Sequence, residues 1–321
     1  MRSKTHRPLS RAEFDRRFPD EAAYAEHLAA LRWPGGFVCP RCGGRKGWRV
    51  GGGRGDAGLW ECAGCHRQTS VTAGTALHRS KLPLRAWFTA LHIVTSHSNG
   101  ISALQLQSQL GLGSYNTAWL LLRKIRAAMA APEGGALLRG VVEVDEASIP
   151  CRSKDDDLTA DSRGRSHLGK GALIGAVEID KEGRPGRARL AVLPDYSAEK
   201  IGAFVRKAAA PKCGLLTDGL AAYKALDREY DHMPRVVGKM AAHVLMPWAH
   251  RVFSLLKRWS TGTFHGFRRP HLQAHLDEFA WRWSRRCGPA WPAAGSSAAP
   301  RRRTAAQRRP TRASSPAIDA R

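Results

Sequence analysis

The chain has 321 residues, and 43% of them are apolar, so it can form two or three modest domains with buried cores and is not disordered as a whole. Its 52 Lys and Arg against 27 Asp and Glu give a formal net charge of +25. This imbalance attracts polyanions at physiological pH, so nucleic acid is the favoured partner. The sequence has neither a membrane-length apolar run nor a signal-peptide pattern, so we expect a cytoplasmic protein that contacts no membrane.

The N-terminal part of the chain predicts a helical segment followed by a small metal-bound module. Residues 1–36 have helical apolar spacing from about Ser10 to Leu31 and end at the breaker sequence WPGG. Residues 37–75 contain frequent glycines, four cysteines and short β-like runs. We expect this second stretch to be a zinc ribbon.

The cysteine spacing predicts the ribbon's metal. Cys39-x-x-Cys42 and Cys62-x-x-Cys65 are separated by 19 residues, the pattern of a four-thiolate zinc site. A closed set of four thiolates leaves no position for water, so the zinc should be structural. A redox dithiol is the alternative, but neither pair has the strand-helix context of thioredoxin. His66 could replace one thiolate, although a surface position beside the site is the simpler interpretation.

Residues 82–130 predict a helix-turn-helix region. Three helices should open at Pro83, Ser102 and Ser114, with glycines marking the turn between the last two. Near the start of the last helix and along it, the side chains available to DNA are Tyr115, Asn116, Thr117, Arg123 and Lys124. The apolar positions expected in the core are Ile101, Leu104, Leu106, Leu110, Trp119, Leu122 and Ile125.

After a linker at 130–136, residues 138–287 predict an α/β domain with a mixed sheet. The expected strands lie at 140–146, 172–180, 187–193 and 213–217, and the expected helices at 197–209, 220–229, 247–258 and 271–285. From residue 288 the chain changes to Ala, Pro, Ser and Arg, with seven Arg and one Asp. We expect a disordered basic tail at 288–321. Its composition is that of GC-rich DNA read out of frame, so a frameshift near Cys287 is a hypothesis.

The stretch VVEVDEASI carries three carboxylates on a strand suited to a protein interior, where each costs free energy to desolvate. Two-metal phosphoryl transfer needs carboxylates fixed close together on rigid elements. Asp145 on this strand and Asp218 at the end of another apolar strand are the candidates. The alternative for each is a helix cap or a turn, which is the commoner role of Asp after a strand.

A third position is expected on a later helix, where the chain reads PWAHRVFSLLKRW. His250 and Lys257 are seven residues apart, so they share one helical face. A solvated helix face is the alternative for Lys257.

Several stretches together resemble one family. These are CPRCGG, WECAGCHRQTSVTAGT, GISALQLQSQLGLGSYNTAWLLLRKIRAAM, VEVDEASI, TDGLAAY and HRVFSLLKRWSTGTFHG. Over about residues 10–286 the chain is similar to the zinc-ribbon insertion-sequence transposases of the group numbered 1595, which carry an ISXO-type transposase domain.

This resemblance implies a ribonuclease-H-like domain whose metal-binding triad uses two Mg²⁺ ions to cut transposon ends and to join the freed 3′-OH to target DNA. Carried onto this chain, the triad falls at Asp145, Asp218 and His250, and Lys257 matches a lysine that follows the third position and would contact a phosphate. Many members have Glu at that third position. Neutral imidazole adds no negative charge, so Mg²⁺ would be held less tightly, and Mn²⁺ would compensate. Leu255 also departs from the common spelling SNLK.

The two remaining acids on the strand are possible accessory residues. Glu143 should share the face of Asp145, where it could assist the metal or hold a basic residue, and Glu146 should face the other way if the strand is regular. Salt bridges to nearby Arg or Lys are the alternative for both.

Three functions follow in order of preference. The first is a bacterial insertion-sequence transposase that acts on transposon ends and target DNA as a dimer or larger oligomer. The second is a catalytically inactive remnant that only binds DNA through its zinc-dependent part. A zinc-ribbon transcription factor is the third, but it leaves Asp145, Asp218 and the His250–Lys257 pair unexplained.

Overall fold

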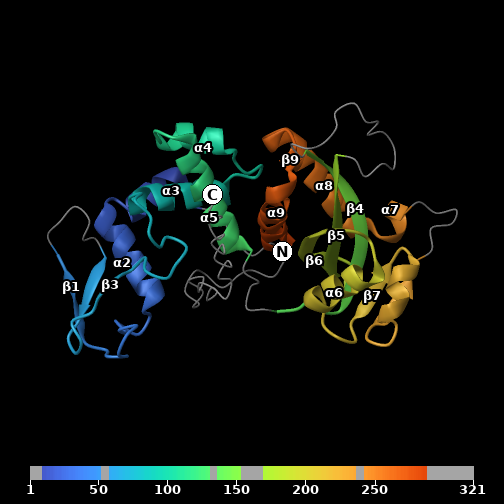
Figure 1. Cartoon of the computed structure of the whole chain (residues 1–321), viewed down its shortest axis with the longest axis horizontal. Coiled ribbons are helices and arrows are strands. Elements are labelled where there is room, and N and C mark those ends of the chain that lie inside the picture. Colours follow the sequence, from blue (N-terminus) through green and yellow to red (C-terminus); the bar gives the residue numbers. More distant parts are fainter. Residues whose placement is uncertain (1–8, 52–57, 131–135, 153–168, 236–241, 288–321) are drawn as a thin grey trace, which may run out of the picture.

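The computed structural model describes residues 9–51, 58–130, 136–152, 169–235 and 242–287. A small sheet and a group of helices form one part of the molecule, and a larger sheet covered by helices forms the other (Figure 1). The tail expected at 288–321 and most of the expected linker lie outside the described residues. Within the described residues, no helix has both the length and the apolar character needed to cross a bilayer.

The N-terminal segment is helical, as expected, and it consists of two helices, α1 (Arg11–Arg17) and α2 (Glu21–Arg32). Pro19 disfavours helical backbone in the residue before it. Asp20 then starts α2, because its side chain accepts a hydrogen bond from the Ala23 N–H at 2.9 Å.

The cysteine-rich module contains a three-stranded antiparallel sheet. Its strands β1 (Gly47–Val50), β2 (Leu59–Cys62) and β3 (Gln68–Ser70) lie in that order and overlap the predicted β-like runs at 48–50, 59–61 and 69–72, whereas the predicted run at 37–38 forms no strand. Helix α2 is tied to this module, because the Arg32 guanidinium donates a hydrogen bond to the Val71 carbonyl at 3.1 Å.

Three helices follow, and each begins directly after its predicted start residue: α3 (Leu84–Ser96), α4 (Ala103–Leu110) and α5 (Tyr115–Met129). Ser102 caps α4 through a reciprocal capping box. Gly111 ends α4 in the left-handed conformation at φ +61°, which a glycine adopts without strain.

The core of these helices contains most of the expected residues. Ile101, Leu106, Leu122 and Ile125 are buried, and Leu110 and Trp119 are partly buried. The prediction that Leu104 lies in the core was wrong, because Leu104 is 67% exposed. It precedes Leu106 by two residues, about 200° around the helix, so the two side chains lie on opposite faces of α4.

The larger sheet is mixed, as expected. Its main path is β6 (Pro185–Leu193), β5 (Lys170–Ile179), β4 (Val141–Arg152), β7 (Gly214–Thr217) and β8 (Asp231–Pro234). The β6-β5-β4 part is antiparallel, and the β4-β7-β8 part is parallel. A short strand, β9 (Phe267–Arg268), pairs with the end of β4. The sequence did not predict β8, which reads DHMP and has no apolar run, or β9, which has only two residues.

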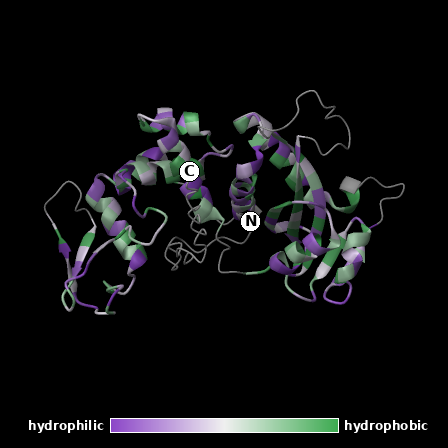
Figure 2. Cartoon of the chain, in the orientation of Figure 1, coloured by the Kyte–Doolittle hydropathy of each residue, from purple (hydrophilic) through white to green (hydrophobic). Residues whose placement is uncertain are grey.

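Helices cover both faces of this sheet. One face packs against α6 (Ala198–Ala208) and the 3-10 helix η3 (Ala221–Leu226), and the other packs against α8 (Pro247–Phe264) and α9 (Leu272–Cys287). Hydrophobic residues recur along the strands and the covering helices (Figure 2). The prediction of a longer helix at 220–229 was wrong, since η3 is a short 3-10 helix. The short elements α7 (Ala242–Leu245) and η4 (Arg269–His271) precede α8 and α9.

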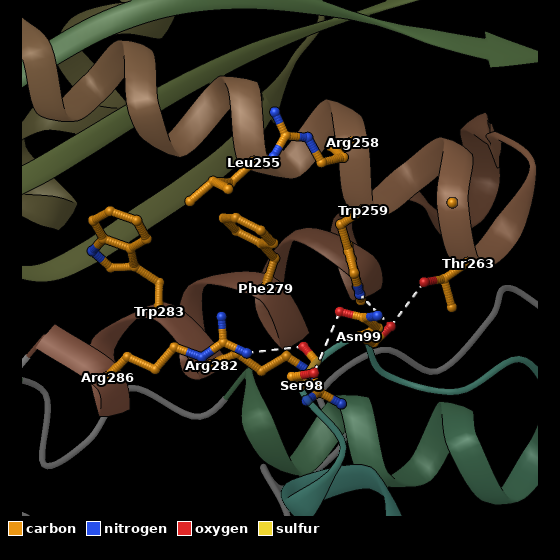
Figure 3. Close-up of a pocket in the computed structure, with 11 residues that line it drawn as sticks. Ser98, Asn99, Leu255, Arg258, Trp259, Thr263, Phe279, Arg282, Trp283 and Arg286 are labelled. Carbon is orange, nitrogen blue, oxygen red and sulfur yellow. Dashed lines mark hydrogen bonds between the residues drawn. The ribbon is translucent and has the colours of Figure 1, made fainter.

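The turn after α3 docks onto α8 and α9. The Trp259 indole and the Thr263 hydroxyl donate hydrogen bonds to the Asn99 carbonyl at 2.9 and 2.8 Å (Figure 3). A cavity of about 260 Å³ beside this contact is lined by aromatic and arginine side chains from α8 and α9. The contact joins the helical region to the larger sheet's helical cover.

A buried ion cluster strengthens the same junction. Glu278 on α9 is 1% exposed and accepts hydrogen bonds from Arg126 of α5 and Arg282 of α9, both at 2.7 Å. Arg282 also donates to the His97 carbonyl at 2.7 Å. A buried charge without such partners would be strongly destabilising. The cluster therefore fixes α5 and the end of α3 against α9.

Two leucines of α4 provide a matched test of this packing. Leu106→Ala should lower the free energy of unfolding by roughly 2–5 kcal/mol, because it empties a fully buried position. Leu104→Ala should change it by less than about 0.5 kcal/mol, as expected for a surface substitution. Urea denaturation followed by circular dichroism measures both. Equal losses in the two variants would contradict the orientation of α4.

Candidate active site and zinc centre

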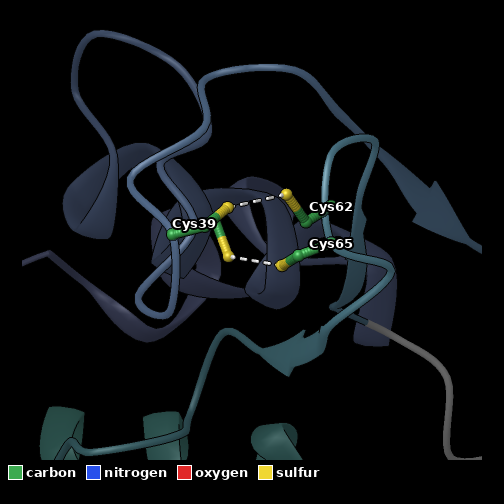
Figure 4. Close-up of side chains that lie close together, drawn as sticks. Cys39, Cys62 and Cys65 are labelled. Carbon is green, nitrogen blue, oxygen red and sulfur yellow. Dashed lines mark hydrogen bonds between the residues drawn. The ribbon is translucent and has the colours of Figure 1, made fainter.

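The four cysteines of the small module converge on one point. All four Sγ atoms lie within 4.8 Å of one another, and the Cys39–Cys65 and Cys42–Cys62 separations are both 3.6 Å (Figure 4). A tetrahedral zinc ion with Zn–S bonds of about 2.3 Å would hold its sulfurs roughly 3.8 Å apart. The four thiols therefore fit a structural zinc ion.

Local backbone geometry prepares one of these thiols, Cys39, for a metal. Hydrogen bonds from the backbone at Cys42 and Arg41 lower the pKa of the Cys39 thiol to about 6, which favours the thiolate that zinc binds. His66 has a side chain that is 74% exposed, and its Nδ1 lies 3.3 Å from a Glu61 carboxylate oxygen. It is a surface neighbour of the site.

The strand arrangement brings Asp145 and Asp218 together. Strand β7 pairs with β4 only from Val141 to Glu143, so the rest of β4 lacks this neighbour. Asp218 directly follows β7 and lies beside that open part of β4. Carboxylate oxygens of Asp145, Asp218 and Glu146 all lie within 4.8 Å of one another. These three residues form the carboxylate cluster.

Glu146 belongs to this cluster although its neighbour Asp145 points to the other face of the sheet. Tyr223 lies in the core on the α6 side and donates a short hydrogen bond to Glu146 Oε1. The expected strand alternation is therefore present. Because β7 has ended at this level, the longer Glu146 side chain can still approach Asp218. In the sequence, the signal for Glu146 is its position next to Asp145, which made it a possible accessory residue and not a member of the predicted triad.

Burial makes the cluster electrostatically costly in the absence of a cation. Burial raises the pKa of Asp145 to about 6, with Asp218 adding to the rise and His250 and Lys257 opposing it. Burial also raises the pKa of Glu146 to about 7, again with a contribution from the neighbouring carboxylates. Oxygen-rich, negatively charged groups of this kind suit Mg²⁺ or Mn²⁺.

Glu143 has a different position. It is 1% exposed, and its Oε2 accepts hydrogen bonds from the backbone N–H groups of Trp248 and Ala249 at 2.9 and 2.7 Å. A carboxylate at a helix N-terminus satisfies orphan donors and interacts favourably with the helix dipole. Among the described residues, no Lys or Arg forms an ion pair with Glu143 or Glu146. Glu143 therefore holds the start of α8 to β4.

Helix α8 carries the other two predicted site residues. His250 Nε2 lies 3.6 Å from Asp145 Oδ2, although the imidazole is not part of the carboxylate cluster. Lys257 lies two turns further along α8 and is exposed. Its positive charge favours ionised Asp145.

A glycine allows α8 to approach the sheet this closely. Gly175 on β5 pairs directly with Asp145 on β4. A Cβ at Gly175 would lie 2.9 Å from Phe253 Cζ and from a Leu190 methyl carbon, which is closer than packed atoms allow. The absence of a side chain there sets the distance between Asp145 and α8.

Asp218 also stabilises the turn that follows β7, since its Oδ1 accepts a hydrogen bond from the Leu220 N–H at 2.9 Å. The turn role named as an alternative is therefore present together with the cluster position. His232, on neighbouring β8, is structural. Its ring bonds Thr217 and Asp227 at 2.9 and 2.5 Å.

The candidate DNA-contacting side chains of α5 differ in their availability. Tyr115 is 49% exposed, Asn116 and Arg123 are exposed, and Thr117 is partly buried. Lys124 instead donates a hydrogen bond to the His78 carbonyl at 3.0 Å and lies over the Trp87 ring. Its ammonium group is engaged by the protein.

A mixed sheet with clustered carboxylates beside its central strand is consistent with a ribonuclease-H-like transposase domain. Residues 137–284 match the ISXO2-like transposase domain, and residues 19–68 match the transposase zinc-ribbon domain, both of the IS1595 group. The two matches together span more than half of the chain. The chain therefore belongs to the IS1595 transposase family.

One relative and one solved structure complete the comparison. A protein of Halobacterium salinarum, described as an uncharacterized protein in transposable element ISH50, is 27% identical over 217 residues, or 66% of this chain and 72% of the relative. A chain from the crystal structure of a pre-cleavage Mos1 transpososome is 14% identical, with a TM-score of 0.25 over 58% of this chain and 70% of that chain.

The zinc centre can be tested by metal content. Cys62→Ser should lose most of the zinc, about one ion per chain in the parent, because three thiolates no longer close the site. Cys213→Ser removes a buried cysteine of the larger domain and should keep it. Mass spectrometry of the purified proteins measures the bound metal. Full zinc content in the Cys62 variant would contradict the assignment.

The carboxylate cluster predicts a pH-dependent stability. Because the folded-state pKa of Glu146, about 7, exceeds its unfolded value, the folded protein binds more protons, and stability falls as pH rises from about 4 to 7. Without divalent cation, Glu146→Gln should therefore raise the free energy of unfolding at pH 8 by on the order of 1–3 kcal/mol. This gain should shrink at pH 5.

The measurement is thermal unfolding in buffer freed of Mg²⁺ by dialysis, since a chelator would also remove zinc. Glu199→Gln is the matched control, because Glu199 has a side chain that is 81% exposed. A stability gain that is equal at pH 5 and pH 8 would show that Glu146 does not experience this repulsion.

Proposed function

We propose that this chain is an active insertion-sequence transposase that cuts the ends of its element and joins the freed 3′-OH to target DNA by two-metal phosphoryl transfer. One observation carries the proposal: three carboxylates, two of them with a raised pKa, meet beside the central strand of the domain that matches the transposase family. Such a set can bind divalent cations, and little else in a protein requires it.

Asp145, Glu146 and Asp218 are the residues that would hold the cations. When bound, a pair of divalent ions supplies activation of the attacking oxygen and stabilisation of the leaving oxygen. The chain's own contribution is a rigid, partly desolvated set of oxygen ligands. Tyr223 fixes the rotamer of Glu146 through its hydrogen bond. Mg²⁺ and Mn²⁺ both suit this donor set.

Glu146 compensates for the negative charge that His250 does not supply. The third position of the family pattern holds a neutral imidazole, which adds no negative charge. Glu146 supplies a third carboxylate from β4 instead, and His250 beside Asp145 adds a nitrogen ligand or a hydrogen-bond partner. Lys257, on the same face of α8, is proposed to contact a DNA phosphate near the reacting bond.

We infer that α4 and α5 form a helix-turn-helix that binds the element's ends. The short turn at Gly111 and the exposed start of α5 support this inference. Tyr115, Asn116, Thr117 and Arg123 are the proposed DNA contacts. The contribution of Lys124 would be to orient α5, since its ammonium group is bonded to the protein.

The proposed domain division follows the sequence: 1–36 helical, 37–75 zinc ribbon, 82–130 helix-turn-helix, 138–287 transposase domain and 288–321 tail. The zinc-ribbon match begins at residue 19, and α2 bonds the ribbon, so α2 is best grouped with it. At least a dimer on DNA is proposed, because two element ends must be brought together. Bacterial origin and a cytoplasmic site of action belong to the same proposal.

The inactive remnant is the less favoured function. A decayed catalytic domain has no need to keep three carboxylates at a desolvation cost, and a zinc-ribbon transcription factor has no need for them either. The described elements from β4 to α9 pack around two hydrophobic clusters, which likewise supports a working domain.

Strand cleavage tests the proposal. The substrate is a labelled duplex of the element's terminal repeat, incubated with the full chain and Mg²⁺ or Mn²⁺. Asp145→Asn, Asp218→Asn and Glu146→Gln should each reduce cleavage about 100-fold or more, since each removes charge stabilisation worth several kcal/mol. End binding without divalent cation should remain.

Two further variants sharpen the result. His250→Glu should keep or increase cleavage with Mg²⁺, because it adds a carboxylate beside Asp145. Glu199→Gln, on the far side of the sheet from α8, should cut like the parent. If the parent binds its end but cuts with neither metal, the chain is a DNA-binding remnant and the proposal is wrong.

A further inference from the structure

A cavity of about 690 Å³ lies apart from the carboxylate cluster, between the starts of α4 and α5 and the segment that joins α8 to α9. Tyr115 and Trp119 line it from α5, and Arg268 and His271 line it from the other side. This volume is typical of sites for small ligands and cofactors. The cavity lies between the proposed DNA-binding helices and the transposase domain.

The charge of this cavity suits an anionic ligand. The described residues that line it include two arginines and three histidines, and none of them is Asp or Glu. Arg268 is exposed and free to reach a phosphate from the cavity wall. A guanidinium group recognises phosphate oxygens through paired hydrogen bonds.

Two residues of the lining hold buried polar atoms without a hydrogen-bond partner among the described residues. These atoms are Arg126 Nη2 and His275 Nδ1, and the described chain has only one other such atom. The Arg126 side chain is 8% exposed. Burial lowers the pKa of His275 to about 2, so its ring is neutral and offers one donor and one acceptor. Unsatisfied groups of this kind cost free energy that a hydrogen-bonding ligand recovers.

Aromatic surfaces complete the site. Tyr115 is 49% exposed, and the Trp119 and His271 rings meet edge to face with centroids 5.1 Å apart. Aromatic faces bind nucleobases by stacking, whatever the base. The lining therefore offers Arg268 to a phosphate and the Tyr115 and Trp119 rings to a base face. The unpartnered atoms of Arg126 and His275 are available to the edge of a base.

We propose that this cavity binds a single nucleotide of the element's end that has left the base stack. The inference rests on the proposed function, because it requires the chain to bind DNA ends. A paired base has both faces covered by its neighbours and cannot reach side chains at the depth of Arg126 and His275. An unstacked nucleotide can place its base against Trp119 and its phosphate at Arg268.

Binding titrations test the inference with the full zinc-loaded chain and no divalent cation, so that no strand is cut. The probes are fluorescent duplexes of the terminal repeat, either fully paired or with one unpaired nucleotide at successive positions. At one position the parent should bind the unpaired form about tenfold more tightly than the paired form. Replacing that nucleotide by an abasic one should remove the gain.

The ratio of the two affinities distinguishes the cavity from general DNA binding. Trp119→Ala and Arg268→Ala should lower the ratio below about twofold. Asn116→Ala, at the proposed duplex contacts, should weaken both forms and leave the ratio unchanged. If Trp119→Ala does not fold, Arg268→Ala decides, because the Arg268 side chain is exposed.

Two results would overturn the inference. If the parent binds the paired duplex and prefers no unpaired form, the cavity is not a nucleotide site, whereas the proposed function stands. If the parent binds neither form, the proposed function and the inference fail together.

Discussion

The burial of carboxylates along β4 is the constraint on which the functional half of this protein depends. Each acid is removed from water and must be compensated in a different way. Glu143 receives two backbone N–H donors, Glu146 receives the Tyr223 hydroxyl, and Asp145 lies beside His250. Glu143 accepts both of its bonds at Oε2 and lies outside the carboxylate cluster. The other two acids, together with Asp218, are left with mutual repulsion that a divalent cation relieves.

The position of α8 follows from the same strand. Glu143 holds the first turn of the helix, and Gly175 lets Phe253 approach the sheet directly opposite Asp145. Because α8 is rigid, these two contacts determine where His250 and Lys257 lie. The positions of His250 and Lys257 therefore depend on the Glu143 cap and the Phe253 packing, neither of which belongs to the carboxylate cluster.

A second buried charge connects α5 to the helices that cover the larger sheet. Glu278 binds Arg126 of α5 and Arg282 of α9, and Arg282 continues to the end of α3. Since α5 and the α9 cover of the larger sheet both bind the same carboxylate, their relative position is fixed in the folded chain. DNA bound at α5 would then meet the carboxylate cluster at a defined distance. The cavity of about 690 Å³ lies along this junction.

The sequence by itself determined the features that depend on neighbouring residues. Cysteine spacing predicted the four converging thiols, and Pro83, Ser102 and Ser114 predicted the starts of three helices, because metal turns and helix caps are local. The apolar strands indicated Asp145 and Asp218 as candidate metal ligands. The family resemblance then placed His250 and Lys257 beside them. Only the tertiary structure placed Glu146 in the cluster and Glu143 under α8. Strand alternation separates Glu146 from Asp145, and their meeting requires β7 to end early, a fact of strand pairing that no single strand's sequence contains.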